Sequence, residues 1–392
     1  METEYSANSG YVEFKTCGYA MKQKIQQVLS ATPGLKGRQI ANKLGLDKRV
    51  VNSYLSKQDG DFIKDENHCW FIVQNDLMEI HLNGETWVDG LSLDRSVASA
   101  GSPLESECSS IHFVVPEGCK ILLEAAARLL SYSNQAIHIG KSVVIDFNEC
   151  QDTLSYFDRI GFFEMLHVDI IVKPNRPLFS SAELFKGNSE AVYEFGEIDP
   201  QDLDEEIPQQ LKQSFVSYAG ERYSQPAFTV LSELFGNVRD HSESPLSGYI
   251  ALQRYKGYKG SGSYGGVKPH IQTIVSDSGR GITGTLKPVL QARYPEIFSM
   301  FDFSDPKSYP LLVSEVFKRG RISQSSDEGR GLGLKRSGEV AASYDAIISV
   351  REGNFELKLT YKSGKIFKTD YELGLPKLMG THICFDFILA KS

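Results

Sequence analysis

Three short glycine-containing motifs follow one another in the second half of the chain, and together they restrict its fold more than any other feature. They run Glu233-Leu-Phe-Gly-Asn237-Val-Arg-Asp-His241, then Asp277-Ser-Gly279-Arg-Gly281, then Gly329-Arg-Gly331-Leu-Gly333-Leu334. A single glycine-rich hexapeptide is common, but this order, spacing and apolar context are hard to obtain by chance. The motifs therefore indicate one composite site.

The first motif lies in a segment with a helical pattern, residues 208–241. Glu233, Asn237 and His241 are spaced i, i+4, i+8, so a helix places them on one face, about 12 Å from end to end. All three side chains can then face the same site.

The second and third motifs combine polar side chains with turns. Asp277 follows the apolar strand residues Ile274 and Val275, so its carboxylate emerges at a strand end. Gly279 and Gly281 allow close backbone approach and positive φ angles there. The glycines of the third motif precede a predicted helix, whose N-terminal amides can hold an anion.

Together the motifs resemble the N box, G1 box and G2 box of the GHKL ATPases, the superfamily of gyrase, a heat-shock chaperone, histidine kinases and MutL. This resemblance implies an ATP-binding α/β sandwich of the Bergerat type over residues 185–392, with an antiparallel-rich sheet backed by helices. The predicted cofactors are ATP and Mg²⁺.

The resemblance also implies roles for the N-box residues. Asn237 corresponds to the Mg²⁺ ligand, and an amide carbonyl is a suitable hard ligand for that ion. Glu233 corresponds to the catalytic general base that orients and deprotonates water. His241 either approaches the phosphates or ends the helix as a favourable C-terminal cation.

The remaining predicted contacts divide between adenine and phosphate. Asp277 is expected to accept a hydrogen bond from the adenine amino group, with support from Thr381. The phosphates are expected to contact the third motif, whose predicted binding residues are Gly329, Arg330, Gly331, Gly333, Leu334 and Lys335.

Residues 11–75 resemble a winged helix-turn-helix domain. Apolar residues at helical spacing predict helices at 21–31, 37–44 and 48–56, the last with Asp47 as its N-cap. Two short apolar runs, 61–64 and 69–73, flank a polar turn and predict a two-stranded wing.

The charge of this segment differs from that of the whole chain. Residues 11–75 hold ten Lys/Arg and six Asp/Glu, a net charge of +4 in a chain of net charge −8. The predicted nucleic-acid contacts are Lys36, Arg38, Lys43, Lys48, Arg49 and Lys57. Because many winged helices dock only to proteins, a protein partner is an equal alternative.

The pattern between these regions changes twice. Residues 76–110 are polar, with a Ser/Gly/Pro-rich run, and are predicted to be a linker. Residues 111–180 alternate strand and helix and loosely resemble a STAS domain, which indicates a small α/β middle domain. The predicted class of the whole chain is α+β.

Composition fits a cytoplasmic multidomain protein. With 41% hydrophobic and 23% charged residues, the chain has enough apolar mass for several cores. No apolar run approaches the roughly 20 residues that cross a bilayer, and the polar N-terminus does not resemble a signal peptide. No membrane partner is expected. The six scattered cysteines indicate reduced thiols.

Three functions fit these features. The first is an ATPase that acts as a conformational switch coupled to the winged helix, with an ATP-dependent homodimer as one form of the switch. The second is a protein kinase of the histidine-kinase or anti-sigma type. The third is a regulator that senses ATP without hydrolysing it.

Overall fold

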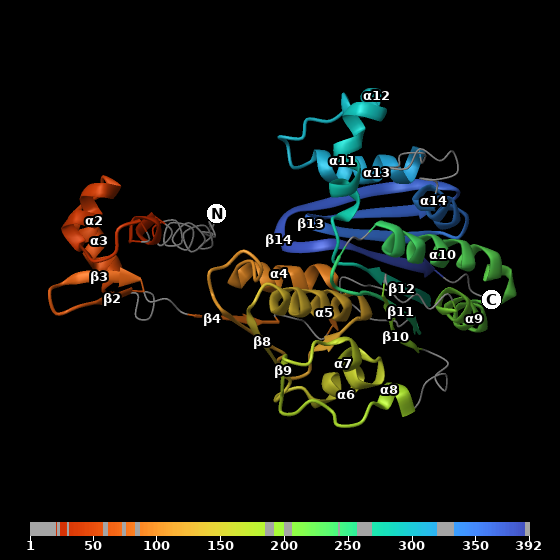
Figure 1. The fold of residues 1–392 in the computed structure, drawn as a ribbon, viewed down its shortest axis with the longest axis horizontal. Helices are drawn as coiled ribbons and strands as arrows, with labels where there is room; N and C mark the ends of the chain where they lie inside the picture. Colours follow the sequence, from red (N-terminus) through yellow and green to blue (C-terminus); the bar gives the residue numbers. More distant parts are fainter. Residues whose placement is uncertain are drawn as a thin grey trace, which may run out of the picture. The chain divides into compact units, whose positions relative to one another are not determined.

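The computed structural model describes residues 21, 24–29, 31–57, 62–72, 76–82, 87–184, 192–199, 206–241, 244–256, 269–319 and 333–388. The chain divides into two compact units, Met1–Asp76 and Leu77–Ser392 (Figure 1).

The first unit has the second and third helices and the wing that the sequence predicts, and the described residues of the first predicted helix, 21, 24–29 and 31, are helical. Its elements are β1 (Leu35–Lys36), α2 (Gly37–Leu44), α3 (Lys48–Leu55), β2 (Phe62–Lys64) and β3 (Cys69–Ile72). The strands form an antiparallel sheet in the order β1-β3-β2. Asp47 caps α3, since its Oδ1 accepts a hydrogen bond from the Arg49 N–H at 2.7 Å. Ile40, Val51 and Leu55 form part of the core.

The second unit begins with an α/β part. Its elements are β4 (Leu77–His81), β5 (Trp87–Val88), α4 (Gly90–Ala100), β6 (Ser110–Val114), β7 (Lys120–Ile121), α5 (Leu123–His138), β8 (Ser142–Asp146), α6 (Gln151–Arg159), α7 (Phe162–Met165), β9 (Ile171–Lys173) and α8 (Ser181–Leu184). A parallel sheet has the order β4-β6-β8-β9.

The expected linker at residues 76–110 is instead structured, and the α/β part begins at β4 rather than at residue 111. Exposed and buried residues alternate along β4, as in a strand with one covered face. Asp89 caps α4 through the Ser92 N–H, and Leu93 and Val97 are buried. The serines of α4 led to the prediction of a loop because serine also favours turns.

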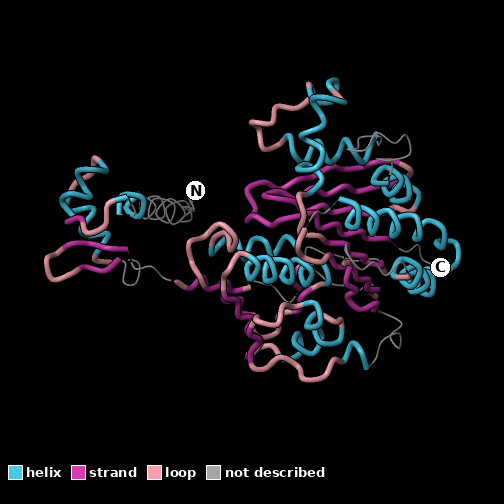
Figure 2. The backbone as a smooth tube through the Cα atoms, in the orientation of Figure 1, coloured by secondary structure: helices cyan, strands magenta, loops and turns pink. Residues whose placement is uncertain are grey.

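The rest of the unit surrounds a five-stranded sheet. Its elements are β10 (Val192–Ile198), α9 (Ile207–Ala219), η1 (Glu221–Tyr223), α10 (Ser224–His241), β11 (Gly248–Tyr255), β12 (His270–Ser276), α11 (Gly281–Arg293), α12 (Pro295–Phe298), α13 (Ser308–Arg319), α14 (Gly333–Ser343), β13 (Ala346–Lys362) and β14 (Lys365–Ile388). The antiparallel order is β10-β11-β12-β14-β13, and β13 and β14 form one long hairpin (Figure 2).

Both faces of this sheet are buried, which explains the continuous apolar run of β11. Ile250 and Leu252 belong to the core shared with α9, α10, α13 and α14. Tyr249 and Ala251, on the opposite face, belong to the core of the α/β part. The α/β part and the five-stranded sheet therefore share one core, although the sequence suggested separate domains at 111–180 and 185–392. The observed architecture is α+β.

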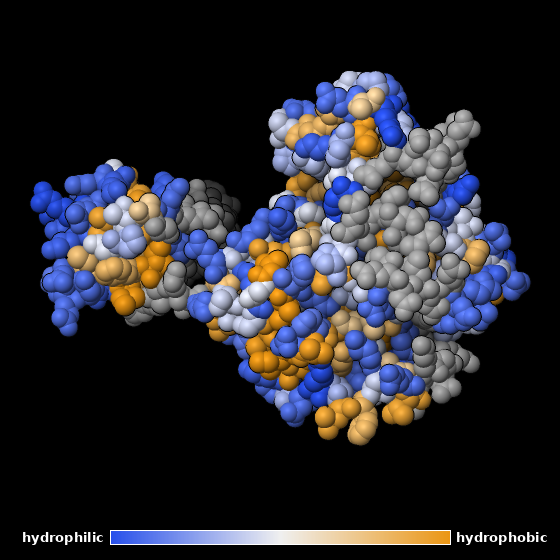
Figure 3. Space-filling model, in the orientation of Figure 1, coloured by the Kyte–Doolittle hydropathy of each residue, from blue (hydrophilic) through white to orange (hydrophobic). Residues whose placement is uncertain are grey.

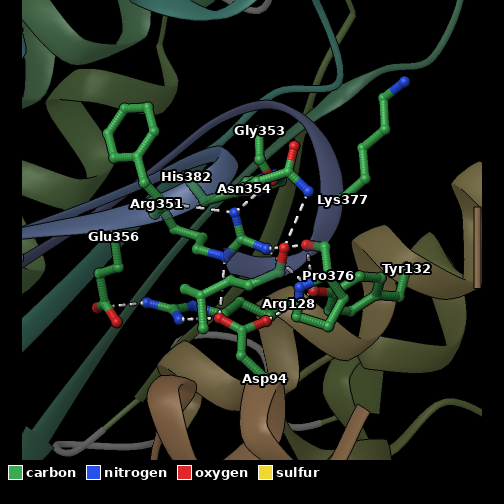
Figure 4. A network of polar contacts seen from close by, with 12 residues as sticks. Asp94, Arg128, Tyr132, Arg351, Gly353, Asn354, Glu356, Pro376, Lys377 and His382 are labelled. Atoms are coloured by element: carbon green, nitrogen blue, oxygen red, sulfur yellow. Dashed lines mark hydrogen bonds and ion pairs between the residues drawn. The ribbon is translucent and has the colours of Figure 1, made fainter. Parts of the chain in front are cut away.

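A buried charge network joins the two parts (Figure 4). Asp94 Oδ2 of α4 lies 2.6 Å from Arg128 Nη1 of α5 and 2.9 Å from Arg351 Nε of β13. Tyr132 donates its hydroxyl to Asp94 Oδ1 at 2.7 Å. Arg128 also pairs with Glu356 at 2.8 Å. Helices α4 and α5 are thereby tied to the long hairpin.

The surface is largely hydrophilic on the face shown in Figure 3, with apolar patches over the β4–α8 part. Leu178 and Phe179 are among the exposed apolar residues. Among the described residues, no helix is both long enough and apolar enough to span a membrane.

Candidate functional site

The first motif forms the end of α10, as predicted. Asn237 is partly buried, and among the described residues its Nδ2 has no hydrogen-bond partner although that atom is inaccessible to solvent. Glu233 Oε1 accepts a hydrogen bond from Arg336 Nη1 of α14 at 2.8 Å. His241 is the last residue of α10, and its side chain lies outside the described part of the chain. Burying an amide N–H group without a hydrogen-bond partner is costly, which suggests that the Asn237 amide binds a ligand.

Helix α10 passes close to the end of β12, where the second motif begins. A Cβ on Gly248 would lie 2.6 Å from Val238 Cγ1 and 2.8 Å from the Ser276 carbonyl oxygen. The residue after Asn237 and the residue before Asp277 therefore both lie next to Gly248. The first two motifs, about 40 residues apart in sequence, meet at this point.

Asp277 is the best-defined residue of the site. It is 9% exposed, and its Oδ1 accepts a hydrogen bond from the Gly279 N–H at 2.7 Å. Burial raises the pKa of this carboxyl to about 6, while backbone hydrogen bonds from Gly279 and Thr381 act in the opposite direction. The Asp277 N–H donates to the Thr381 carbonyl at 2.9 Å. Thr381 therefore supports Asp277 through its backbone.

Two glycines are required at this turn. Gly380 has φ of +85°, and a Cβ there would lie 2.0 Å from the Asp277 carbonyl oxygen. Gly281 has φ of +73°, and its Cβ would lie 2.6 Å from Glu352 Cδ. At both positions a residue with a side chain is excluded, because L residues disfavour positive φ and the space that a Cβ would need is filled. Gly279 contributes its N–H and does not have a positive φ.

Two residues outside the motifs hold the turn. Gln135 of α5 donates from Nε2 to Ser278 Oγ and to the Met379 carbonyl, both at 2.9 Å, and its Oε1 accepts from the Met379 N–H at 2.9 Å. Glu352 of β13 accepts hydrogen bonds from the start of α11. Sequence reasoning missed both, because nothing near either residue in sequence marks it as a neighbour of Asp277.

The third motif is only partly described. Gly329, Arg330 and Gly331 lie outside the described residues, while Gly333 is the first residue of α14. Leu334 packs against the apolar clusters beneath α14. Lys335 Nζ lies 3.5 Å from Glu339 Oε1 on the same helix. Through the Glu233–Arg336 pair, the start of α14 is linked to the first motif.

The six predicted nucleic-acid contacts of the first unit have exposed side chains. Lys43 Nζ lies within hydrogen-bond distance of Thr32 Oγ1, at 3.4 Å. Exposure is a requirement for phosphate contact and also the ordinary state of surface lysines and arginines.

The arrangement suits a ligand that has a hydrogen-bond donor at one end and oxygen acceptors at the other. A buried carboxylate is presented at the β12 end, and an amide follows on α10. Within the described ranges, no three His, Cys, Asp or Glu side chains form a group that could hold a metal ion.

Comparison with protein-family models, with curated proteins and with solved structures found no match to this chain. Any functional assignment therefore depends on the residues of the site themselves.

Proposed function

We propose that Asp277 and Asn237 lie in an ATP site of the GHKL type, within an α/β sandwich over residues 185–392. The observation that carries this proposal is the buried Asp277 carboxylate in a turn that requires Gly281 and Gly380. Burial raises its pKa to about 6, so the ionised form is costly in the folded chain. A ligand that donates a hydrogen bond would offset that cost, and perturbed carboxyls of this kind cluster at functional sites.

Adenine is the base that fits this carboxylate. Its exocyclic amino group is a donor, whereas guanine presents a carbonyl oxygen at the equivalent position and would be repelled. The Gly279 N–H holds Asp277 Oδ1 at 2.7 Å, which fixes the direction of the carboxylate. The turn therefore provides selectivity as well as affinity.

Asn237 is suited to the phosphate end of the nucleotide. Its carbonyl oxygen can bind Mg²⁺, and its Nδ2, which has no partner among the residues that the structure describes, can donate to a phosphate oxygen. When bound, Mg²⁺ would neutralise phosphate charge and polarise the terminal phosphoryl group. The glycines of the third motif and the N-terminus of α14 would hold the same phosphates.

Glu233 is the proposed general base. Its carboxylate pairs with Arg336 at 2.8 Å, and Arg336 belongs to the helix that begins at Gly333. Phosphate binding at the start of α14 would act on the helix that holds the base. ATP would thus control both catalysis and the position of α14, which is the physical basis for a switch.

The output of the switch would be the first unit. The six predicted contact residues of this unit have exposed basic side chains that suit nucleic-acid phosphates, and a protein partner would use the same exposed helices. The Glu233–Arg336 pair also favours a second candidate function. If Glu233 stays paired with Arg336, it cannot activate water. The protein would then leave ATP intact, as in the sensing alternative, or transfer the γ-phosphate of ATP to another protein, as in the kinase alternative.

The test follows the γ-phosphate of labelled ATP in Glu233→Gln and in the parental protein. We expect the parent to release free phosphate and Glu233→Gln to bind Mg²⁺ and ATP normally while hydrolysis falls about 10² to 10⁴-fold. Glu221→Gln, an exposed carboxylate on η1, is the matched control and should match the parent. Labelled protein would indicate a kinase, and intact bound ATP a sensor. Absence of ATP binding to the parent would reject the site.

A further inference from the structure

A second buried carboxylate lies beside the Asp277 turn, and neither the motifs nor the proposed chemistry uses it. Glu352 of β13 is 4% exposed and pairs in register with Thr381 of β14. Its Oε2 accepts a hydrogen bond from the Ile282 N–H at 3.0 Å, and its Oε1 accepts from the Thr283 N–H at 2.9 Å. The Thr283 hydroxyl also donates to Oε1.

These bonds fix the start of α11, the helix that follows the second motif directly. Ile282 and Thr283 lie in its first turn, where backbone N–H groups have no partner within the helix. A Cβ on Gly281 would lie 2.6 Å from Glu352 Cδ, so the carboxylate fills the space beside the glycine. Glu352 therefore contacts the turn directly at Gly281.

The Glu352 side chain differs in two ways from an ordinary helix cap. It comes from a strand about 70 residues further along the chain, and it uses both oxygens. An N-terminal cap normally comes from the residue next to the helix. Because Glu352 of β13 and Thr381 of β14 are partners in the strand register, the same pairing also positions the Thr381 backbone that contacts Asp277.

We propose that Glu352 is a positioning residue for nucleotide binding, which holds the backbone of residues 279–283 in the conformation that directs Asp277 toward adenine. This inference rests on the proposed ATP site. Glu352 acts through the turn and does not itself contact the base.

The ionisable groups near Glu352 make the effect dependent on pH. Burial and the nearby Asp277 raise the pKa of Glu352 to about 7, against hydrogen bonds from Thr283 and Ile282. Arg280, at the start of α11, has an exposed side chain, and burial of His382 lowers the pKa of that imidazole to about 3. Protonation of Glu352 removes an acceptor from the N–H groups, so the turn should loosen as pH falls through about 7.

The test measures ATP affinity by calorimetry from pH 6.5 to 8.5 for the parent, Glu352→Gln and Thr283→Val. We expect the parent to bind more weakly as pH falls through this range. Glu352→Gln should bind about tenfold more weakly at pH 8.5, with a flatter pH profile, because one amide position is a donor facing an N–H donor. Thr283→Val removes one hydroxyl donor and should weaken binding about two- to fivefold.

Glu356→Gln is the matched control, since Glu356 is buried on the same strand but pairs with Arg128. It should lose stability and keep the parental affinity and pH profile. If Glu352→Gln and Thr283→Val both bind as the parent does at every pH, Glu352 only stabilises α11 and the inference is wrong. If the parent binds no ATP, the proposed function fails, and this inference fails with it.

Discussion

Two buried aspartates of the same unit have opposite surroundings. Asp94 lies between Arg128 and Arg351, with a hydrogen bond from Tyr132 (Figure 4). Burial alone would raise its pKa, but attraction to the two arginines and the Tyr132 hydrogen bond lower it overall. Asp277 is held by backbone N–H groups, and burial raises its pKa to about 6.

The difference indicates what each carboxylate is for. The charge of Asp94 is compensated within the fold, so it connects α4 and α5 to the sheet and has no need of a ligand. The charge of Asp277 is compensated only by weaker partners, the backbone N–H groups, so its ionised form costs stability in the free protein. A cost of this kind is expected where a residue is kept for binding rather than for folding.

The largest expected effect is loss of stability when Asp94 is neutralised. Asp94→Asn leaves Arg128 and Arg351 buried beside each other with less compensation, and it should lower the unfolding free energy by about 3 to 5 kcal/mol. Urea unfolding at pH 7 measures this. Asp94 has a lowered pKa, so its contribution in the parent should persist above the unfolded value of 3.8 and disappear as pH falls below it.

Asp370→Asn provides the control for charge alone. Asp370 is a half-exposed carboxylate on β14, and its Oδ2 lies 2.9 Å from Lys368 Nζ. Its replacement should cost less than about 1 kcal/mol. A similar small cost for Asp94→Asn would show that the buried network does not hold the two parts together.

The second expected effect has the opposite sign for stability. Asp277→Asn removes a carboxylate whose ionisation opposes folding, so it should raise the unfolding free energy of the free protein by about 1 to 3 kcal/mol at pH 7. The same variant should bind ATP at least about tenfold more weakly, since a charge-assisted hydrogen bond is lost. Urea unfolding and calorimetry measure the two quantities.

The pH dependence of this difference follows from the raised pKa. Below 3.8 the carboxyl is neutral in both the folded and unfolded chain, so parent and variant should differ little. As pH rises from 3.8 to about 6 the unfolded carboxyl ionises first, so the parent should lose stability relative to Asp277→Asn. A variant that is less stable than the parent above pH 6 would contradict this interpretation.

The smallest expected effect concerns Gln135. This residue lies on α5, the helix that carries Arg128 of the Asp94 network, and its side chain bonds to the turn that holds Asp277. Gln135→Leu removes the bridge to Ser278 and Met379 but leaves Asp277 in place, so ATP affinity should fall only about two- to fivefold while stability falls by about 1 to 3 kcal/mol. Asn134→Leu is the matched control. Asn134 is a buried amide on the same helix that bonds to Met165 and Tyr249 instead. Equal affinity losses in both variants would remove Gln135 from the site.

The sequence by itself determined the local elements of the first unit and the main residues of the second motif. Helices α2 and α3 and both wing strands follow from apolar spacing and the Asp47 cap, which are properties of neighbouring residues. Asp277 could be placed at a strand end next to a turn because its apolar strand and glycines are adjacent in sequence. The ATP and Mg²⁺ assignment, and the roles of Glu233 and Asn237, stay predictions.

Only the tertiary structure decided how the parts combine. The segment at residues 76–110 is built into the α/β part, and the core of that part extends onto the second face of the five-stranded sheet. Gln135 and Glu352 reach the Asp277 turn from positions about 140 residues before it and about 75 residues after it. Sequence patterns report burial and spacing along one element, whereas such contacts depend on which faces pack together, and that choice is made by the whole core.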